Sequence, residues 1–272
     1  MDILSELGPA SYRQIEADSW QGLVHQHKQD FVAEEVPVVL VYNDKPHVVM
    51  LCTPVDLEDF AIGFSMTENI VRSIADIQSV KVYQRSKGIE VRLNIPESCS
   101  SQMADKGKNL TGRTGCGLCG ATTLEQAIRP VRKVGEGLKL DATLLTQAFN
   151  DLNARQHINQ LTGAIHAAAW LDKNQGLLQV REDVGRHNAL DKLIGSLAKA
   201  DVDFSQGWLL VTSRASYEMV QKAASVGISL LAAISAPTAL AINLAEQSGL
   251  TLIGFARGDR HVVYTHPHRL QH

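Results

Sequence analysis

The stretch "GWLLVTSRASYEMVQKAASVGISLLAAISAPTALAINLAEQSGLTLIGFA", residues 207–256, decides the fold. Apolar runs alternate in it with segments of helical character. Ser216 and Thr238 stand where helix N-caps belong, and Gly227 and Gly249 stand where those helices should end. Near-continuous apolar strands joined by helices are typical of a buried parallel sheet with right-handed crossovers. We therefore predict an α/β fold whose C-terminal domain has a largely parallel sheet.

The uncharged run at residues 223–245, inside this stretch, has the length of a membrane span. Gly227, Ser235, Pro237 and Asn243 interrupt it in a strand-turn-helix pattern, so burial in the sheet is the better interpretation. At the N-terminus, "MDILSELGPA" has an acidic residue where a signal peptide needs positive charge. We expect a cytoplasmic protein with no membrane partner.

The carboxyl ends of the predicted strands are the expected ligand site, because helix N-termini and loops converge there in open parallel sheets. The loops are "SRAS" (213–216), "SAPT" (235–238) and "FARGDR" (255–260). Their hydroxyl and guanidinium groups suit phosphate. We predict that a phosphorylated or nucleotide-like ligand binds there, with Ser213, Arg214, Ser235 and Thr238 among its contacts. The alternative is that the hydroxyls only cap helices and the arginines are only solvated.

A dense set of charged groups precedes another predicted helix, in "REDVGRHNALDKLIG" (181–195). His187 follows Arg186 at the helix start, where an imidazole is well placed to contact an anion or transfer a proton. Upstream, "GAIHAAAWL" (163–171) and "LLQVRED" (177–183) are predicted to form a hairpin.

A small α+β domain is predicted at residues 31–98, where strands, one helix and two further strands follow each other. Residues 1–30 are interpreted as an N-terminal extension. The polar segment 99–115 is interpreted as a flexible linker into a C-terminal domain at 116–272. We identify no chemical constellation in the small domain.

Composition excludes some classes of function. With 26 basic and 29 acidic residues, the net charge of -3 provides no basic field for nucleic acid. Four cysteines are too few for a disulfide scaffold, and Cys52 ends an apolar run as a core residue would.

Cys116 and Cys119, in "TGRTGCGLCG" (111–120), have the spacing of a zinc site, a redox disulfide or a nucleophilic thiol with a helper. A structural zinc site lacks a second ligand pair, since only the scattered His166 and His187 are available to complete it. A redox pair of the thioredoxin type starts a helix after a strand, whereas a polar glycine-rich loop precedes this one.

Motifs spread over most of the chain resemble one family. In order they are "GRTGCGLCG", "GAIHAAAW", "EDVGRHNALDKLIG", "SRASYEMVQKAA", "SAPTALAINLAE" and "GFARGDRHVVYTHP". Together they closely resemble the formate dehydrogenase accessory proteins, FdhD, over residues 33–267. This resemblance implies a cytidine-deaminase-like C-terminal domain and a cytoplasmic homodimer. It also implies a sulfurtransferase that takes sulfur as a persulfide from a cysteine desulfurase. The sulfur is then passed to molybdenum bis(molybdopterin guanine dinucleotide), destined for the formate dehydrogenase apoenzyme.

The resemblance also assigns residues. Cys116 corresponds to the persulfide-bearing cysteine, and Cys119 is its partner in the motif. The family's binding site for the guanine dinucleotide cofactor corresponds to Phe255, Ala256, Arg257, Gly258, Asp259 and Arg260. These residues lie at the same sheet edge that the strand ends predict. A guanine nucleotide is expected to mimic the cofactor, and no zinc is expected. Zinc deaminases need a Glu where this chain has Ala168, so deamination is not expected. Two rival functions remain open: a cofactor-carrying chaperone without sulfur chemistry, and a zinc-dependent hydrolase.

Overall fold

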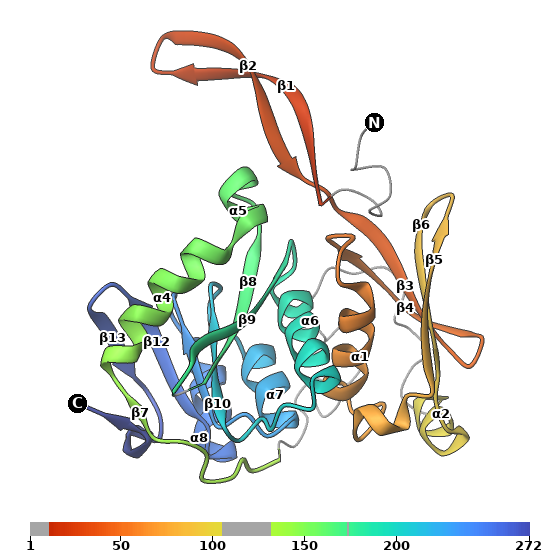
Figure 1. Cartoon of the computed structure of the whole chain (residues 1–272), viewed down its shortest axis with the longest axis vertical. Coiled ribbons are helices and arrows are strands. Elements are labelled where there is room, and N and C mark those ends of the chain that lie inside the picture. Colours follow the sequence, from red (N-terminus) through yellow and green to blue (C-terminus); the bar gives the residue numbers. More distant parts are fainter. Residues whose placement is uncertain (1–10, 105–131, 173) are drawn as a thin grey trace.

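The computed structural model describes residues 11–104, 132–172 and 174–272 (Figure 1). Its larger sheet has strand order β13-β12-β11-β10-β8-β9. The strands are β8 (His166–Asp172), β9 (Gly176–Asp183), β10 (Gly207–Val211), β11 (Leu230–Ala233), β12 (Thr251–Arg257) and β13 (Arg260–Val263). Strands β10, β11 and β12 run parallel, whereas β8, β9 and β13 pair antiparallel. The predicted parallel core and β8–β9 hairpin are confirmed, but the sheet as a whole is mixed rather than largely parallel.

Helices cover both faces of this sheet, which explains why its central strands are apolar throughout. Helices α6 (Arg186–Lys199), α7 (Tyr217–Ser225) and α8 (Ala239–Ser248) lie on one face. Helix α4 (Thr143–Arg155) crosses the other face and is followed by α5 (His157–Thr162) (Figure 1). In β10, Leu209 packs into the first core and Leu210 into the second. Successive side chains of a strand point to opposite faces, so each face receives its own apolar residues.

The predicted N-caps and terminating glycines of the two crossover helices are confirmed at three of the four residues. The Thr238 hydroxyl caps α8 by accepting a hydrogen bond from the Ala241 N–H. Gly227 and Gly249 follow their helices with positive φ angles of 89° and 76°, a region that glycine tolerates. Ser216 is the N-cap residue of α7 by its backbone, but its side chain makes no capping bond.

The predicted small α+β fold is confirmed. Strands β3 (Val36–Tyr42), β4 (Lys45–Cys52), β5 (Ser79–Arg85) and β6 (Gly88–Asn94) form a sheet of order β4-β3-β6-β5. Helix α1 (Leu57–Thr67) and the short η2 (Ile74–Asp76) lie between β4 and β5 in the chain, and α2 (Glu97–Ala104) follows β6. Residues 99–104 of the predicted flexible linker are therefore all helical, because they belong to α2, which is a correction of that prediction. The rest of the linker lies outside the described residues. The domain boundaries themselves stay a prediction.

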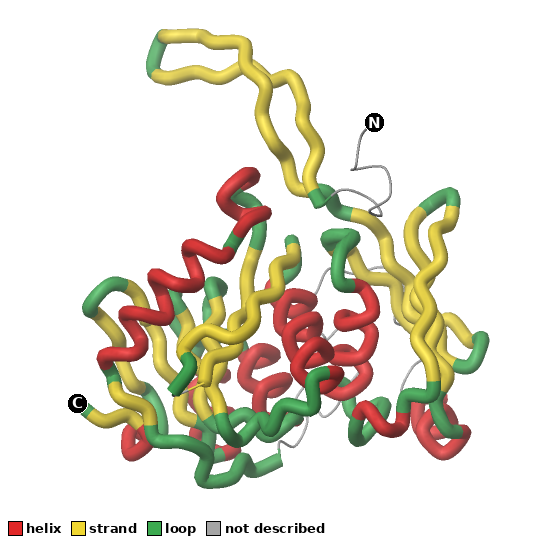
Figure 2. The backbone as a smooth tube through the Cα atoms, viewed as in Figure 1, coloured by secondary structure: helices red, strands yellow, loops and turns green. Residues whose placement is uncertain are grey.

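The two bodies meet through α1 and α6, which lie side by side between the sheets (Figure 2). Gly63 of α1 and Gly195 of α6 allow the two backbones to touch. A short parallel ladder of β7 (Leu140–Asp141) and β14 (Leu270–Gln271), with η3 (Pro267–Arg269) before it, closes the C-terminal end.

A long hairpin stands apart from both sheets (Figure 2). It consists of β1 (Tyr12–Gln21) and β2 (Val24–Ala33), with Gly22 at φ 61° in its turn. Most of the predicted N-terminal extension is therefore a regular antiparallel ribbon. Among the helices of the described chain, none is both long and apolar enough to cross a membrane.

Candidate functional site

The three predicted loops lie together at one edge of the larger sheet, where backbone hydrogen bonds join them. The Thr238 N–H donates to the Ala215 carbonyl at 3.1 Å, which links the second loop to the first. The Phe255 N–H donates to the Ser235 carbonyl at 3.2 Å, which links the third loop to the second. The carboxyl ends of β10, β11 and β12 therefore form a continuous surface, as parallel strands predict.

The hydroxyl residues of the first two loops differ in their accessibility. Ser213 is buried, and its hydroxyl donates to the Arg214 carbonyl at 3.0 Å. Arg214 itself is exposed. Ser235 and Thr238 are half-buried, and the Thr238 hydroxyl is used in the helix cap. Arg214 is therefore the residue of these loops most open to a ligand.

The third loop, residues 255–260, carries the strongest concentration of exposed charge at this edge. Phe255 has a φ of 54°, a left-handed conformation that is uncommon outside glycine. Ala256 is buried, whereas residues 257–260 are exposed. The Arg260 guanidinium lies 5.1 Å from the centre of the Phe255 ring. The Thr146 hydroxyl of α4 donates to the Gly258 carbonyl at 2.8 Å, which anchors the loop tip.

The turn between β9 and α6 reaches the same edge. The Thr212 N–H, just beyond β10, donates to the Ala167 carbonyl of β8, and His166 of β8 pairs with Asp183 of β9. Arg186 and His187 begin α6 directly after this pairing. The structure thus brings the predicted His187 to the edge that carries the three loops.

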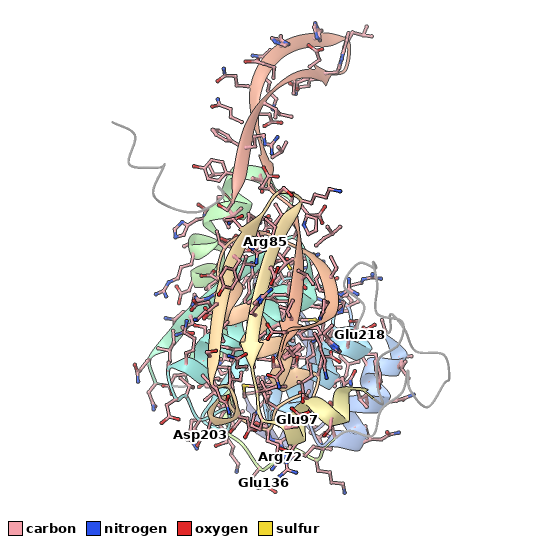
Figure 3. All side chains as sticks on the ribbon, turned by 90° about the vertical axis from the view of Figure 1, so that its right-hand side faces the viewer. Arg72, Arg85, Glu97, Glu136, Asp203 and Glu218 are labelled. Carbon is pink, nitrogen blue, oxygen red and sulfur yellow. The ribbon has the colours of Figure 1, made fainter. Side chains whose placement is uncertain are left out.

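His187 is 3% exposed, and its Nε2 lies 3.8 Å from the Glu218 carboxylate of α7. In the view of Figure 3, Glu218 is labelled at the right-hand side of the molecule, on α7. Burial lowers the pKa of His187, although Glu218 acts in the opposite direction. A neutral imidazole carries one donor and one acceptor nitrogen, so it is able to accept or give a proton at this edge.

Buried polar atoms beyond ordinary hydrogen-bond distance of a partner lie close to His187. In the described part of the chain these are Arg186 Nε, His187 Nε2 and Ser216 Oγ. Buried polar groups are nearly always paired, and each unpaired one costs about 1–3 kcal/mol. The Glu218 carboxylate interacts with His187 and with Ser216 and offsets part of this cost. These three atoms lie at the starts of α6 and α7, at the edge of the sheet that carries the three loops. From the sequence, Ser216 is predicted only as a helix cap, and Arg186 is named only as the neighbour of His187.

The predicted cysteine site, Cys116 and Cys119, lies outside the described residues. Cys52 is buried as predicted, and burial raises the pKa of its thiol. Cys99 is partly exposed in α2. Among the residues that the structure describes, no group of three or more His, Cys, Asp or Glu side chains is placed to hold a metal ion. The expectation that the protein binds no zinc stays a prediction.

Comparison with known proteins agrees with the sequence motifs. Residues 33–271 match the model of the FdhD/NarQ family. The sulfur carrier protein FdhD of Cupriavidus necator is 50% identical over 264 residues, which cover 97% of this chain and 92% of that protein. The sulfur carrier protein FdhD of Xanthomonas campestris is 54% identical over 243 residues, covering 89% of this chain and 86% of that protein.

A solved structure shows the same fold. It is a crystal structure of a protein proposed to be a formate dehydrogenase accessory protein from Desulfotalea psychrophila. The two structures align with a TM-score of 0.75 over 96% of this chain and 100% of the other, at 21% sequence identity. With a family model that spans most of its length and relatives at about half identity, this chain belongs to the FdhD/NarQ family.

Proposed function

We propose that this protein is a sulfurtransferase that accepts sulfur from a cysteine desulfurase and passes it to molybdenum bis(molybdopterin guanine dinucleotide) for formate dehydrogenase. The relatives named as sulfur carrier proteins support the carrier role. The observation in this chain that carries the proposal is the sheet edge, where the exposed Arg214, Arg257 and Arg260 lie together at the carboxyl ends of β10 and β12.

The chemistry of the edge fits the phosphates of a dinucleotide. Exposed Arg214, Arg257 and Arg260 supply guanidinium groups that bind phosphate in a bidentate manner. Helices α6, α7 and α8 all start at this edge, and their N–H groups favour anions. In this proposal the segment Phe255–Arg260 holds the guanine dinucleotide part of the substrate, with the other loops beside it.

The sulfur step is assigned to Cys116. Its thiolate attacks the outer sulfur of a donor persulfide, a new S–S bond forms, and the donor's own S–S bond breaks. The donor leaves as a thiolate, and Cys116 retains the terminal sulfur without net oxidation or reduction. Cys119 assists from its position in the same motif. The cytoplasmic location, the homodimer and the cytidine-deaminase-like relationship implied by the family resemblance belong to the same proposal.

Mass spectrometry tests the carrier step directly. After incubation with a cysteine desulfurase and cysteine, we expect the protein to gain about 32 Da, the mass of one sulfur, on the peptide that contains Cys116. Cys52 provides an internal control, because it is fully buried and its raised thiol pKa disfavours the thiolate. Addition of sulfur to Cys99 alone, or to no cysteine, would favour a chaperone that only carries the cofactor.

A further inference from the structure

Thr53, the residue after β4 in the small domain, forms hydrogen bonds through its N–H, hydroxyl and carbonyl groups to residues 183, 184 and 192, around the start of α6. Its N–H donates to Asp183 Oδ2 at 3.0 Å, and its hydroxyl oxygen accepts from the Val184 N–H at 3.0 Å. Its carbonyl accepts from Lys192 Nζ at 2.9 Å. Thr53 is 0% exposed, so none of these bonds is exchanged for water. One residue of the small domain therefore fixes the entry into α6.

Asp183 completes this attachment with both carboxylate oxygens. Oδ2, which binds Thr53, also lies 2.7 Å from Lys192 Nζ. Oδ1 accepts from the Gly185 N–H at 2.8 Å and from Asn188 Nδ2 at 2.9 Å. Asp183 is fully buried, and a buried carboxylate with this many partners is held in one orientation. The turn 183–188 is thus fixed at both of its ends.

Arg186 and His187 lie between these fixed points. Both residues lie at the sheet edge that carries the three loops, and the polar atoms of Thr53 and Asp183 are engaged with the turn that holds them. A ligand site needs its contacting groups held in place by such supporting bonds. The small domain, whose sequence carries no predicted catalytic or binding residues, supplies some of these supporting bonds through Thr53.

We propose that Thr53 is a positioning residue: it holds the turn that presents Arg186 and His187, so that the small domain sets the affinity of the edge for a guanine nucleotide. This inference rests on the proposed function for the identity of the ligand. Ligand binding would then depend on Thr53 of the small domain, although Thr53 itself does not contact the ligand.

Thr67 offers a matched control. It is also a fully buried threonine of the small domain, and its hydroxyl donates to Asp191 Oδ1 of α6 at 2.7 Å. It also accepts from Lys222 Nζ of α7 at 2.9 Å. Thr67→Val therefore removes a hydroxyl from the same interface between domains, but away from the turn. Thr53→Val removes the acceptor of the Val184 N–H, and Thr53→Ser retains it.

The experiment measures the dissociation constant for GDP in the full-length wild type and in Thr53→Val, Thr53→Ser and Thr67→Val, together with the unfolding temperature of each. We expect Thr53→Val to weaken GDP binding by about 10-fold, because small displacements of contacting groups are costly. Thr53→Ser should bind like the wild type. Thr67→Val should lose stability without losing affinity.

Equal affinity in Thr53→Val and Thr67→Val, with a wild type that binds GDP, would overturn the inference alone. Failure of the wild type to bind GDP would overturn the proposed function and the inference with it. Amide hydrogen exchange provides a second measurement in the same samples. Protection at Val184 and Gly185 should fall in Thr53→Val and persist in Thr67→Val, and unchanged protection in both would also overturn the inference.

Discussion

Gly63 in α1 and Gly195 in α6 lie against each other's helix so closely that neither position has room for a side chain. A Cβ on Gly63 would lie 1.8 Å from the carbonyl oxygen of Asp191, and a Cβ on Gly195 would lie 1.9 Å from that of Asp59. Both obstacles are backbone atoms, which cannot rotate away. This glycine pair is what brings the small domain close enough for Thr53 to reach the turn at 183–188.

We predict that Gly63→Ala destabilises the protein, although alanine is the better helix former. Alanine gains about 1 kcal/mol of helix propensity, whereas forcing a methyl group into a tightly packed contact costs typically about 1–3 kcal/mol, and occasionally more, where backbone atoms cannot move away. Chemical denaturation should therefore show a net loss in the free energy of unfolding. Gly135→Ala is the control, because a Cβ there meets no atom within 4 Å and should change little. Equal stability of the two variants would show that the helices do not pack this closely.

Removing one partner of the buried ion pair between Lys192 and Asp183 should lower the free energy of unfolding strongly. Both side chains are 0% exposed, at 2.7 Å from each other. Lys192→Met leaves a carboxylate buried without its cation, for which we expect a loss of about 3–5 kcal/mol. Lys28→Met, at an exposed pair with Asp30, should cost no more than about 1 kcal/mol. Equal losses, measured by urea denaturation, would contradict the buried pairing.

Stability should fall as the pH is lowered from 7.5 to 5.5, in part through His187. Burial holds the pKa of His187 below its ordinary value of 6.5, so the unfolded chain binds the proton first. The stabilisation is therefore present above pH 6.5 and is lost as the pH falls toward the folded pKa, at up to about 1.4 kcal/mol per pH unit. In urea titrations His187→Gln should flatten this dependence, and His268→Gln, at an exposed residue, should not. An unchanged slope in His187→Gln would show that folding does not lower the pKa of this imidazole.

Arg257 and Arg260 should contribute to guanine nucleotide binding at the 255–260 loop. A hydrogen bond between charged groups contributes about 1.5–3 kcal/mol, so Arg257→Gln or Arg260→Gln should weaken GDP binding about 10-fold or more in calorimetry. The control is Arg72→Gln, at an exposed residue that lies below the smaller sheet in Figure 3. A GDP affinity that responds equally to all three substitutions would place the nucleotide elsewhere.

Local signals were sufficient to predict the centre of the larger sheet. The signals used were apolar strands, the Thr238 cap and the glycines after α7 and α8. Each of them depends only on residues close to it in the sequence. The directions of β8 and β13 relative to that centre depend on pairing between distant segments, which no local pattern encodes. The hairpin β1–β2 was missed because it has little apolar alternation, and it is largely exposed.

The candidate site shows the same division. The loops at 213–216, 235–238 and 255–260 were predicted because strand order alone places them at one edge. Thr53 lies four residues before α1, which begins at Leu57. Its partners Asp183 and Val184 lie about 130 residues away in the sequence. A hydrogen bond of that kind leaves no trace in composition or spacing, so only the structure shows it.

The central claim is that sulfur travels through Cys116, and one complementation experiment tests it most directly. Formate dehydrogenase activity is measured in a bacterial strain that lacks its own family member and carries the wild type, Cys116→Ala or Cys99→Ala at equal protein level. The account predicts full activity with the wild type and Cys99→Ala, and none above background with Cys116→Ala. Restoration of activity by a folded Cys116→Ala protein would contradict it and would leave cofactor carriage as the function.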